Sequence, residues 1–364
     1  MPAGVASPSD PLALVLHIGM GKTGTSSIQV FLNRNRDTLA ALGYLYPRSP
    51  GLKRHTRLGL FIRPDDDLLR HRNWPRQNAA DPVAFRKSFR RRLFKEIDSS
   101  GLSHVVLSDE GLYIASDPAL RRLRRFTDRI ARNVRILVYL RRQDDQLISR
   151  YQQEVKVGEV QRLDQWARRG FERIYDYRAR LRTHARLLEP TQLVVRRFET
   201  PSFVDGSLYQ DFLDAAGIAA RAMDLEQVAI RNVSLDAESV ECLRLLNLYR
   251  VEHEGAIPRM IDNRELTSKL VHGSTGPSLT MPNSFLDEFM DGWKASNSAV
   301  ARDFLGMTEG PLFQLPRKSR NTTTEQRLDP ARLDYFMRLL ELPEQVHEPL
   351  RRLAEREARA PAPR

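Results

Sequence analysis

The chain reads LHIGMGKTGTSSIQVFL from Leu16 to Leu32, and this stretch decides the fold class. The residues that lead into it, LALVLHI (Leu12–Ile18), form an apolar run typical of a strand buried on both faces of a parallel sheet. After the glycine-rich turn, Ile28, Phe31 and Leu32 recur at helical spacing. We therefore expect a strand, a glycine turn and a helix in succession, as in α/β proteins.

The turn has the composition of an anion-binding loop. Three glycines lie between Gly19 and Gly24, and they let the backbone approach a ligand closely. Unpaired N–H groups at the start of the following helix attract anions, and Lys22 adds a full positive charge. Thr25 and Ser26 add hydroxyl groups at the start of that helix. The loop therefore predicts a site for phosphate or a phosphate-like group, and a purely structural glycine turn is the alternative.

The loop does not fit the nucleotidase pattern G-x-x-x-x-G-K-[ST]. With Gly21, Lys22 and Thr23 in register, the first glycine of that pattern falls on Leu16, inside the expected strand. An ATP-dependent small-molecule kinase, which would need magnesium, is therefore an alternative that the loop does not favour.

Composition describes a globular protein with affinity for anions. The chain has 364 residues, of which 41% are hydrophobic and 29% charged, and its net charge is +12. A nucleic-acid platform would interleave aromatic with basic residues, whereas the helical segment LRRLRRFTDRIARNV (Leu120–Val134) has one apolar stripe and outward arginines. We expect an anionic cofactor or polymer rather than nucleic acid, although a basic anion- or nucleic-acid-binding protein without catalysis stays open.

The same composition bears on location. No run approaches the ~20 apolar residues of a membrane helix, and residues 1–11 lack the pattern of a secretory signal. A lone cysteine, Cys242, lies in a helix-like apolar run and is expected to be a buried, inert thiol. Heavy use of arginine indicates a bacterial gene, so we expect a cytoplasmic bacterial protein; the oligomeric state is not indicated.

Strand patterns alternate with helical patterns along the first two thirds of the chain. Further apolar strands are expected at HVVLS (His104–Ser108), VRILVYL (Val134–Leu140) and QLVVRRF (Gln192–Phe198). The prediction is a P-loop-like three-layer α/β sandwich with a central parallel sheet and a mostly helical C-terminal part. The expected parts are a flexible leader (1–11), an α/β domain (12–310) with acceptor-cleft insertions (48–80 and 254–283), a C-terminal basic loop and helix (311–355) and a disordered tail (356–364).

The carboxyl ends of the strands are where ligands bind in such sheets. The strand VRILVYL ends in Arg141 and Arg142, where a nucleotidase would commonly place a metal-binding Asp. Ser149 follows Arg141 by eight residues, about two helical turns into the next helix. Two cations beside a phosphate loop predict a second phosphate.

Together these motifs resemble those of sulfotransferases that use 3′-phosphoadenosine 5′-phosphosulfate. The run KTGTS (Lys22–Ser26) is similar to their 5′-phosphosulfate loop, and the spacing of Arg141, Asp145 and Ser149 resembles their 3′-phosphate signature. The opening HIGMGKTGTSSIQ and later stretches up to SNSAVARDFLG look like bacterial carbohydrate-type members. The resemblance covers about residues 12 to 307.

The resemblance implies an activity and a set of site residues. The donor would transfer its sulfuryl group to an acceptor hydroxyl, of a carbohydrate or glycolipid, and leave as 3′,5′-adenosine bisphosphate without a metal. Arg141 and Ser149 would bind the 3′-phosphate, and the loop would bind the 5′-phosphosulfate through Gly21, Lys22, Thr23, Gly24, Thr25 and Ser26. Gly21 stands where bacterial relatives often carry His. The acceptor itself is not identified.

Two residues compete for the role of general base. The strand HVVLS is followed by Asp109 and Glu110, and the resemblance points to Glu110, because relatives place a catalytic His or Glu just after the corresponding strand. A carboxylate can serve if burial raises its pKa, and a plain acid at a helix start is the alternative. His55, in the loop KRHTRL, is the competing base, and His17 is expected to be structural. Lys22 is expected to stabilise charge on the leaving oxygen.

A basic segment late in the chain resembles a feature of animal relatives. It reads LPRKSRN from Leu315 to Asn321, with its cations between Arg317 and Arg320. Animal relatives close their cofactor site with a basic loop near the C-terminus, so this segment could close the site here. A solvated run of charges is the alternative.

Overall fold

The structure is a computed structural model that describes residues 12–228, 234–318, 324 and 326–359. The chain folds into two compact units. The first comprises Met1–Arg141, Glu172–Arg231 and Ala295–Leu315, and the second comprises Arg142–Phe171, Asn232–Lys294 and Pro316–Arg364. The division departs from the single α/β domain expected over residues 12–310, because the segments Arg142–Phe171 and Asn232–Lys294 belong to the second unit.

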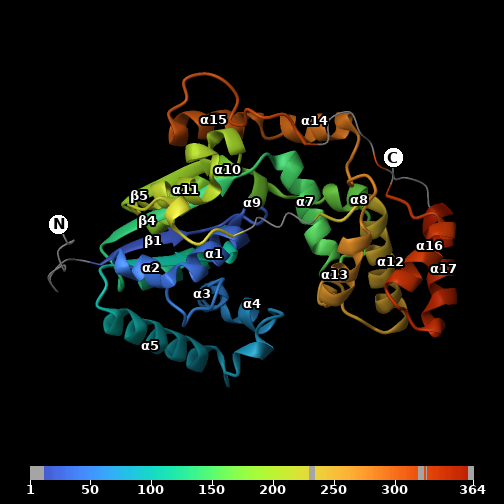
Figure 1. Ribbon diagram of the computed structural model, residues 1–364, viewed down its shortest axis with the longest axis horizontal. Helices are drawn as coiled ribbons and strands as arrows, with labels where there is room; N and C mark the ends of the chain where they lie inside the picture. The colour runs from blue at the N-terminus through green and yellow to red at the C-terminus, as the bar shows by residue number, and fades with distance from the viewer. Residues whose placement is uncertain (1–11, 229–233, 319–323, 325, 360–364) are drawn as a thin grey trace. The chain divides into compact units, whose positions relative to one another are not determined.

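A five-stranded parallel sheet forms the centre of the first unit, so the α/β class is confirmed (Figure 1). The strands are β1 (Ala13–His17), β2 (Tyr44–Leu45), β3 (His104–Ser108), β4 (Asn133–Leu140) and β5 (Gln192–Arg197), in the order β2-β3-β1-β4-β5. Four were expected from their apolar runs, and β2 is an addition. In register, His17 lies opposite Ser108 on one side and Leu137 on the other, which brings the carboxyl ends of the central strands together.

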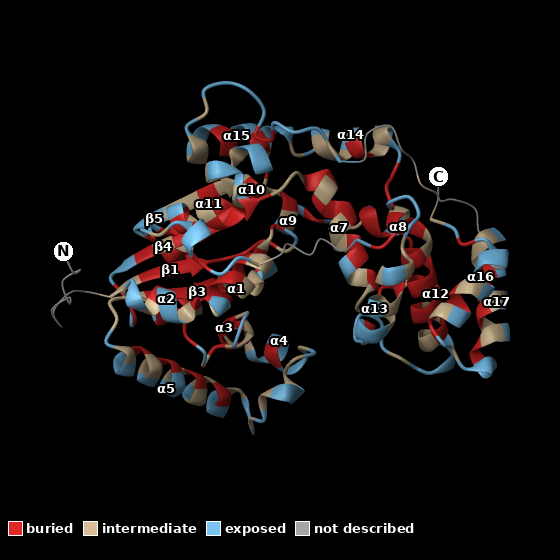
Figure 2. Ribbon diagram, viewed as in Figure 1, coloured by how far each residue is buried: buried red, intermediate tan, exposed pale blue. Residues whose placement is uncertain are grey.

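Side chains alternate between the two faces of this sheet. On one face, Val15, Val106 and Tyr139 belong to a core cluster that they share with α1 (Thr25–Arg34), α2 (Arg36–Ala41) and α11 (Leu208–Ala216). Their strand neighbours on the other face are buried as well, as the red strands in Figure 2 show. The sheet is therefore covered on both faces, which explains the unbroken apolar runs of the sequence.

A second group of helices in the first unit packs together. These are α3 (Thr56–Ile62), α5 (Pro82–Ser100), α6 (Asp117–Thr127) and α10 (Tyr177–Leu188). Helix α6 packs against α10, and α3 packs against both α5 and α6. Further elements of the first unit are α4 (Asp65–Leu69), η1 (Pro75–Gln77), η2 (Glu110–Leu112), α9 (Glu172–Tyr175), η3 (Thr200–Ser202), η4 (Val204–Gly206), η5 (Ala222–Asp224) and α15 (Lys294–Leu305).

The segment 48–80, which was expected to be an acceptor-cleft insertion, contains three of these helices. Helix α3 buries Leu58 and Phe61 despite its short length and its internal glycine. Gly59 lies against the carboxylate of Asp109, and a Cβ at this position would collide with that group. The glycine is thus a packing requirement of the helix, not a signal of a loop.

The described residues of the second unit form helices with a single isolated bridge, between Asp236 and Ser278. The helices are α7 (Gln143–Val155), α8 (Leu163–Ala167), α12 (Ala237–His253), α13 (Arg264–Gly273), α14 (Asn283–Asp291), α16 (Pro330–Leu339) and α17 (Glu344–Arg359). Helix α12 lies at their centre, in contact with α7, α13, α16 and α17. It carries Cys242, whose thiol is buried and whose pKa burial raises, as expected for an inert thiol.

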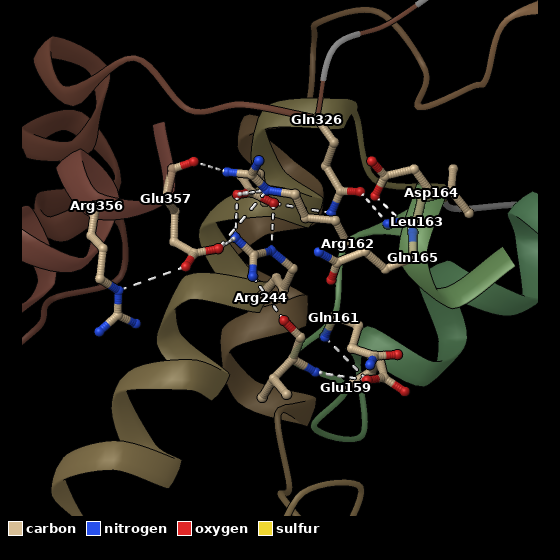
Figure 3. Close-up of polar contacts among 12 residues, drawn as sticks. Glu159, Gln161, Arg162, Leu163, Asp164, Gln165, Arg244, Gln326, Arg356 and Glu357 are labelled. Atoms are coloured by element: carbon tan, nitrogen blue, oxygen red, sulfur yellow. Dashed lines mark hydrogen bonds and ion pairs between the residues drawn. The ribbon is translucent and has the colours of Figure 1, made fainter. Parts of the chain in front are cut away.

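A buried ionic network holds α12 to α17 (Figure 3). The guanidinium of Arg244, with 2% of its side chain exposed, donates to the Glu241 carboxylate at 2.6 and 2.8 Å. It also donates to Glu357 at 2.9 Å and to the carbonyl of Val160 at 2.8 Å. Because every guanidinium nitrogen of Arg244 donates to an acceptor, the cost of burying its charge inside the unit is offset.

The C-terminal boundaries differ from expectation. Helix α17 continues to Arg359, so residues 356–359 of the expected disordered tail are helical. Its amphipathic pattern, with Leu350 and Leu353 buried, carries the helix through a segment rich in charge. Residues 360–364 and the expected leader 1–11 lie outside the described residues. Among the helices described, none combines the length and the apolar character needed to cross a membrane.

Candidate functional site

The glycine loop occupies the carboxyl edge of the sheet between β1 and α1. Leu16 is a fully buried residue of β1, so a strand residue stands where the nucleotidase loop would begin. The N-cap of α1 is Gly24, which has no side chain to accept from the first turn. The N–H groups that begin α1 have no intrahelical partner either, and such groups are available to an anion.

The three glycines of the loop differ in the space available for a Cβ. A Cβ at Gly19 would collide with the side chain of Thr25, and one at Gly24 would lie 2.5 Å from Leu208. Gly24 also has a positive φ of 71°. At Gly21 the nearest atom to a Cβ would be Oε2 of Glu110, at an ordinary 3.8 Å. Gly21 is therefore the position at which the loop itself leaves room toward Glu110.

Two hydroxyls expected at the ligand are used inside the loop. Thr23 and Thr25 are buried, and both donate to the carbonyl of Met20, at 2.5 and 3.2 Å. They shape the turn, and only their backbone N–H groups remain for a ligand. Ser26, by contrast, is exposed, and its hydroxyl lies close enough to Glu110 to lower the pKa of that carboxyl.

Lys22 has a strained backbone and a charged neighbourhood. Its φ is 69°, in the left-handed region that residues with a Cβ rarely adopt. Nη1 of Arg141, the residue after β4, donates to the carbonyl of Lys22 at 3.1 Å and so holds this conformation. Desolvation and the nearby Arg141 lower the pKa of the Lys22 amine, while Glu110 raises it. The predicted loop cation, strand-end cation and acid therefore lie within electrostatic reach of one another.

Glu110 belongs to a charged group that the sequence did not predict in full. It begins η2, directly after Asp109, and about a quarter of its side chain is exposed. Nε of Arg54 donates to the buried Asp109 at 2.7 Å, and another guanidinium nitrogen of Arg54 lies 3.6 Å from Glu110. Burial raises the pKa of Glu110, and Arg54 opposes that rise. A carboxyl with a raised pKa beside the loop can accept a proton from a bound hydroxyl.

His55, the competing base, is occupied by the backbone. It is fully buried at the start of α3. Its Nδ1 accepts from the N–H of Ser108 at 3.1 Å, and its Nε2 lies 3.0 Å from the carbonyl of Pro47. Burial lowers its pKa to about 3. Because both ring nitrogens serve the chain's own backbone, His55 fastens its loop to the end of β3, and the geometry does not offer it as a base.

His17 is also buried, consistent with a structural role. Its Nδ1 lies 2.9 Å from the hydroxyl of Ser108, which also accepts from the amide of Gln29 at 3.1 Å. Its ring lies edge-on against Tyr139 and Phe212. Burial lowers its pKa to about 3, so it remains a neutral part of the core behind the loop.

The residues that follow Arg141 belong to the second unit. Ser149 lies half-buried in α7, so the pair expected at the 3′-phosphate is divided between the two units. Arg142 is paired with the buried Asp144 at 3.0 Å. Arg317, from the basic segment, is almost buried and pairs with Asp287 and, at 3.5 Å, with Asp144. It is thus a fixed part of the second unit, not a solvated charge. Residues 319–321 of that segment, Arg320 included, lie outside the described residues.

Among the described residues, no group of three or more His, Cys, Asp or Glu side chains is arranged to hold a metal ion. Comparisons of the chain with family models, with curated proteins and with solved structures gave no match. The function therefore has to be inferred from the loop, the strand-end arginine and the carboxylate themselves.

Proposed function

We propose that this chain is a sulfotransferase that moves the sulfuryl group of 3′-phosphoadenosine 5′-phosphosulfate to the hydroxyl of a carbohydrate or glycolipid acceptor. One observation carries the proposal. An anion loop with its lysine, a strand-end arginine and a carboxyl of raised pKa converge on one edge of the sheet. Such an edge is where parallel sheets bind ligands.

The loop fits a phosphate-like group. The first turn of α1 presents backbone N–H groups without a side-chain cap, and Lys22 adds a cation beside them. When bound, the donor supplies an activated sulfuryl group on a phosphate leaving group. Lys22 and the N–H groups from Thr23 to Ser26 hold the negative charge that grows on the phosphate oxygen. Glu110 takes the proton of the acceptor hydroxyl at its carboxylate.

The strand ends favour this reaction over a kinase reaction. β4 is followed by Arg141, which contacts the loop carbonyl, whereas a magnesium-dependent nucleotidase commonly has an acid at such a place. A cation there supports binding of a second phosphate on the donor. Sulfuryl transfer, like phosphoryl transfer, asks the protein mainly for alignment and charge stabilisation.

The test is a calorimetric titration with 3′,5′-adenosine bisphosphate, 5′-adenosine diphosphate and Mg-ATP. We expect the bisphosphate to bind without metal, the diphosphate to bind at least tenfold more weakly, and Lys22→Ala to weaken the bisphosphate by a similar factor. Lys87→Ala, an exposed lysine of α5, is the matched control and should bind as the wild type does. Preferential binding of Mg-ATP, with indifference to the 3′-phosphate, would reject the sulfotransferase and support the kinase.

A further inference from the structure

A cavity of about 620 Å³ lies among α3, α5 and α6 of the first unit, and no residue of the glycine loop lines it. Five arginines line it, and we call it the arginine pocket: Arg86, Arg90, Arg122, Arg125 and Arg129. Its apolar lining comes from the buried rings of Phe61 and Phe126 and from Val83, which is 70% exposed. The volume suits a small ligand.

Two of these arginines are part of the scaffold. Arg86 donates to the carbonyls of Phe61 and Arg63 at 3.2 and 2.7 Å and to Asp65 at 2.5 Å. Arg122 donates to the carbonyl of Ile62 at 3.0 Å. Both therefore satisfy the carbonyls at the end of α3, a helix that no sequence pattern predicted. Arg122 is not the outward residue that its helical pattern suggested.

The other three arginines of the pocket do not bond to the scaffold in this way. Within the part of the chain that the structure describes, Arg90, Arg125 and Arg129 have no ion pair and no hydrogen bond through their side chains. One acid, Asp128, lines the pocket, and it is paired with Arg124 at 2.8 Å. The pocket thus collects positive charge that the protein does not neutralise. Desolvation lowers the pKa of Arg122, and the neighbouring Arg86 and Arg125 lower it further.

We propose that the arginine pocket binds a compact anion that carries at least two phosphate or sulfate groups. The guanidinium fork matches the oxygens of these groups in a bidentate way. Three unneutralised cations around one cavity exceed what a single such group would need. The site is separate from the loop and does not depend on the proposed enzymatic activity.

The test removes the loop's own affinity for anions first. In the Lys22→Ala protein, calorimetry at physiological ionic strength would measure binding of inorganic tripolyphosphate, of sucrose octasulfate and of orthophosphate. The first two probes separate phosphate from sulfate as the natural group, and the third reports a single group.

The pocket variant carries Arg90→Gln, Arg125→Gln and Arg129→Gln, which leaves the scaffold arginines in place. The control variant carries Arg91→Gln, Arg92→Gln and Arg121→Gln. These are exposed residues of the same helices outside the pocket, and the net charge falls by the same amount.

We expect one tripolyphosphate or octasulfate to bind per chain, at least tenfold tighter than orthophosphate. The pocket variant should lose at least tenfold in affinity and the control variant less than twofold. Equal losses in the two variants would mean that only net charge attracts the anion, and would overturn the site. Absence of binding by both oligoanions would overturn it as well.

Discussion

Acid should destabilise the first unit through its buried histidines. His17 and His55 are fully buried with pKa values of about 3, and His184 is buried with a pKa of about 4, against an ordinary value of 6.5. Between those values the unfolded chain binds a proton that the folded chain does not, so stability falls as the pH falls below 6.5. Each pH unit costs about 1.4 kcal/mol per histidine, or about 2 kcal/mol each at pH 5.

The contribution of His55 to this acid destabilisation can be measured separately with a variant. His55→Asn removes the ring that joins Ser108 to Pro47, so the variant should be less stable than the wild type at pH 7. It should also lose about 2 kcal/mol less than the wild type between pH 7 and pH 5. Hydrogen exchange of the β1 and β3 amides, corrected for intrinsic rates, would measure the opening free energy of the first unit alone.

The expected difference corresponds to about thirtyfold in the protection of those amides. His272→Asn is the control, because His272 is exposed and lies in the second unit; its pH dependence should match the wild type. If His55→Asn showed the same loss between pH 7 and pH 5 as the wild type, His55 would not be held neutral in the fold. The structural role that we assign to it would then be wrong.

Three further changes test other parts of the structure. Glu110→Gln should reduce sulfuryl transfer by about 10² or more, while calorimetry should show that the affinity for the bisphosphate is retained. Because burial raises the pKa of Glu110, wild-type activity should rise with pH above the ordinary glutamate range. This rise of activity with pH should be absent in the variant. Gly59→Ala places a Cβ against a buried carboxylate and should cost about 1–3 kcal/mol in urea unfolding, whereas Gly111→Ala, with its nearest atom at 3.5 Å, should cost much less. Arg244→Ala removes the main partner of the buried Glu241 and should destabilise the second unit by about 3–5 kcal/mol, seen as loss of exchange protection in α12 and an unchanged β1.

The sheet could be predicted because its strands are buried on both faces. The runs at β1, β3, β4 and β5 are continuous and apolar, and their alternation with helices requires parallel pairing. β2 was missed because Tyr44–Leu45 is too short to show a period. α3 was missed because its glycine and the basic residues that flank it are typical of a loop. Gly59 is a glycine because its backbone packs against Asp109, a residue that is distant in sequence.

The site was predictable to the extent that it follows from the sheet. Arg141 comes directly after β4, Glu110 is the second residue after β3, and Lys22 lies in the loop that follows β1; parallel strands end on one edge. Arg54 could not be found in this way, because it reaches Asp109 from a loop that follows the edge strand β2. The same holds for Thr23 and Thr25, whose hydroxyls turn inward to Met20. Side-chain direction within a loop depends on contacts that sequence spacing does not encode.

The left-handed backbone at Lys22 sets the stability of the loop against the anion binding that we propose for it. A residue with a Cβ in this region costs about 1–2 kcal/mol relative to glycine, so a chain optimised for folding alone would carry Gly or Asn here. Selection of a random library at position 22 for heat resistance should therefore enrich these two residues. Selection for anion binding should return lysine, which would mark the position as one where evolution has kept a less stable loop for the sake of its charge.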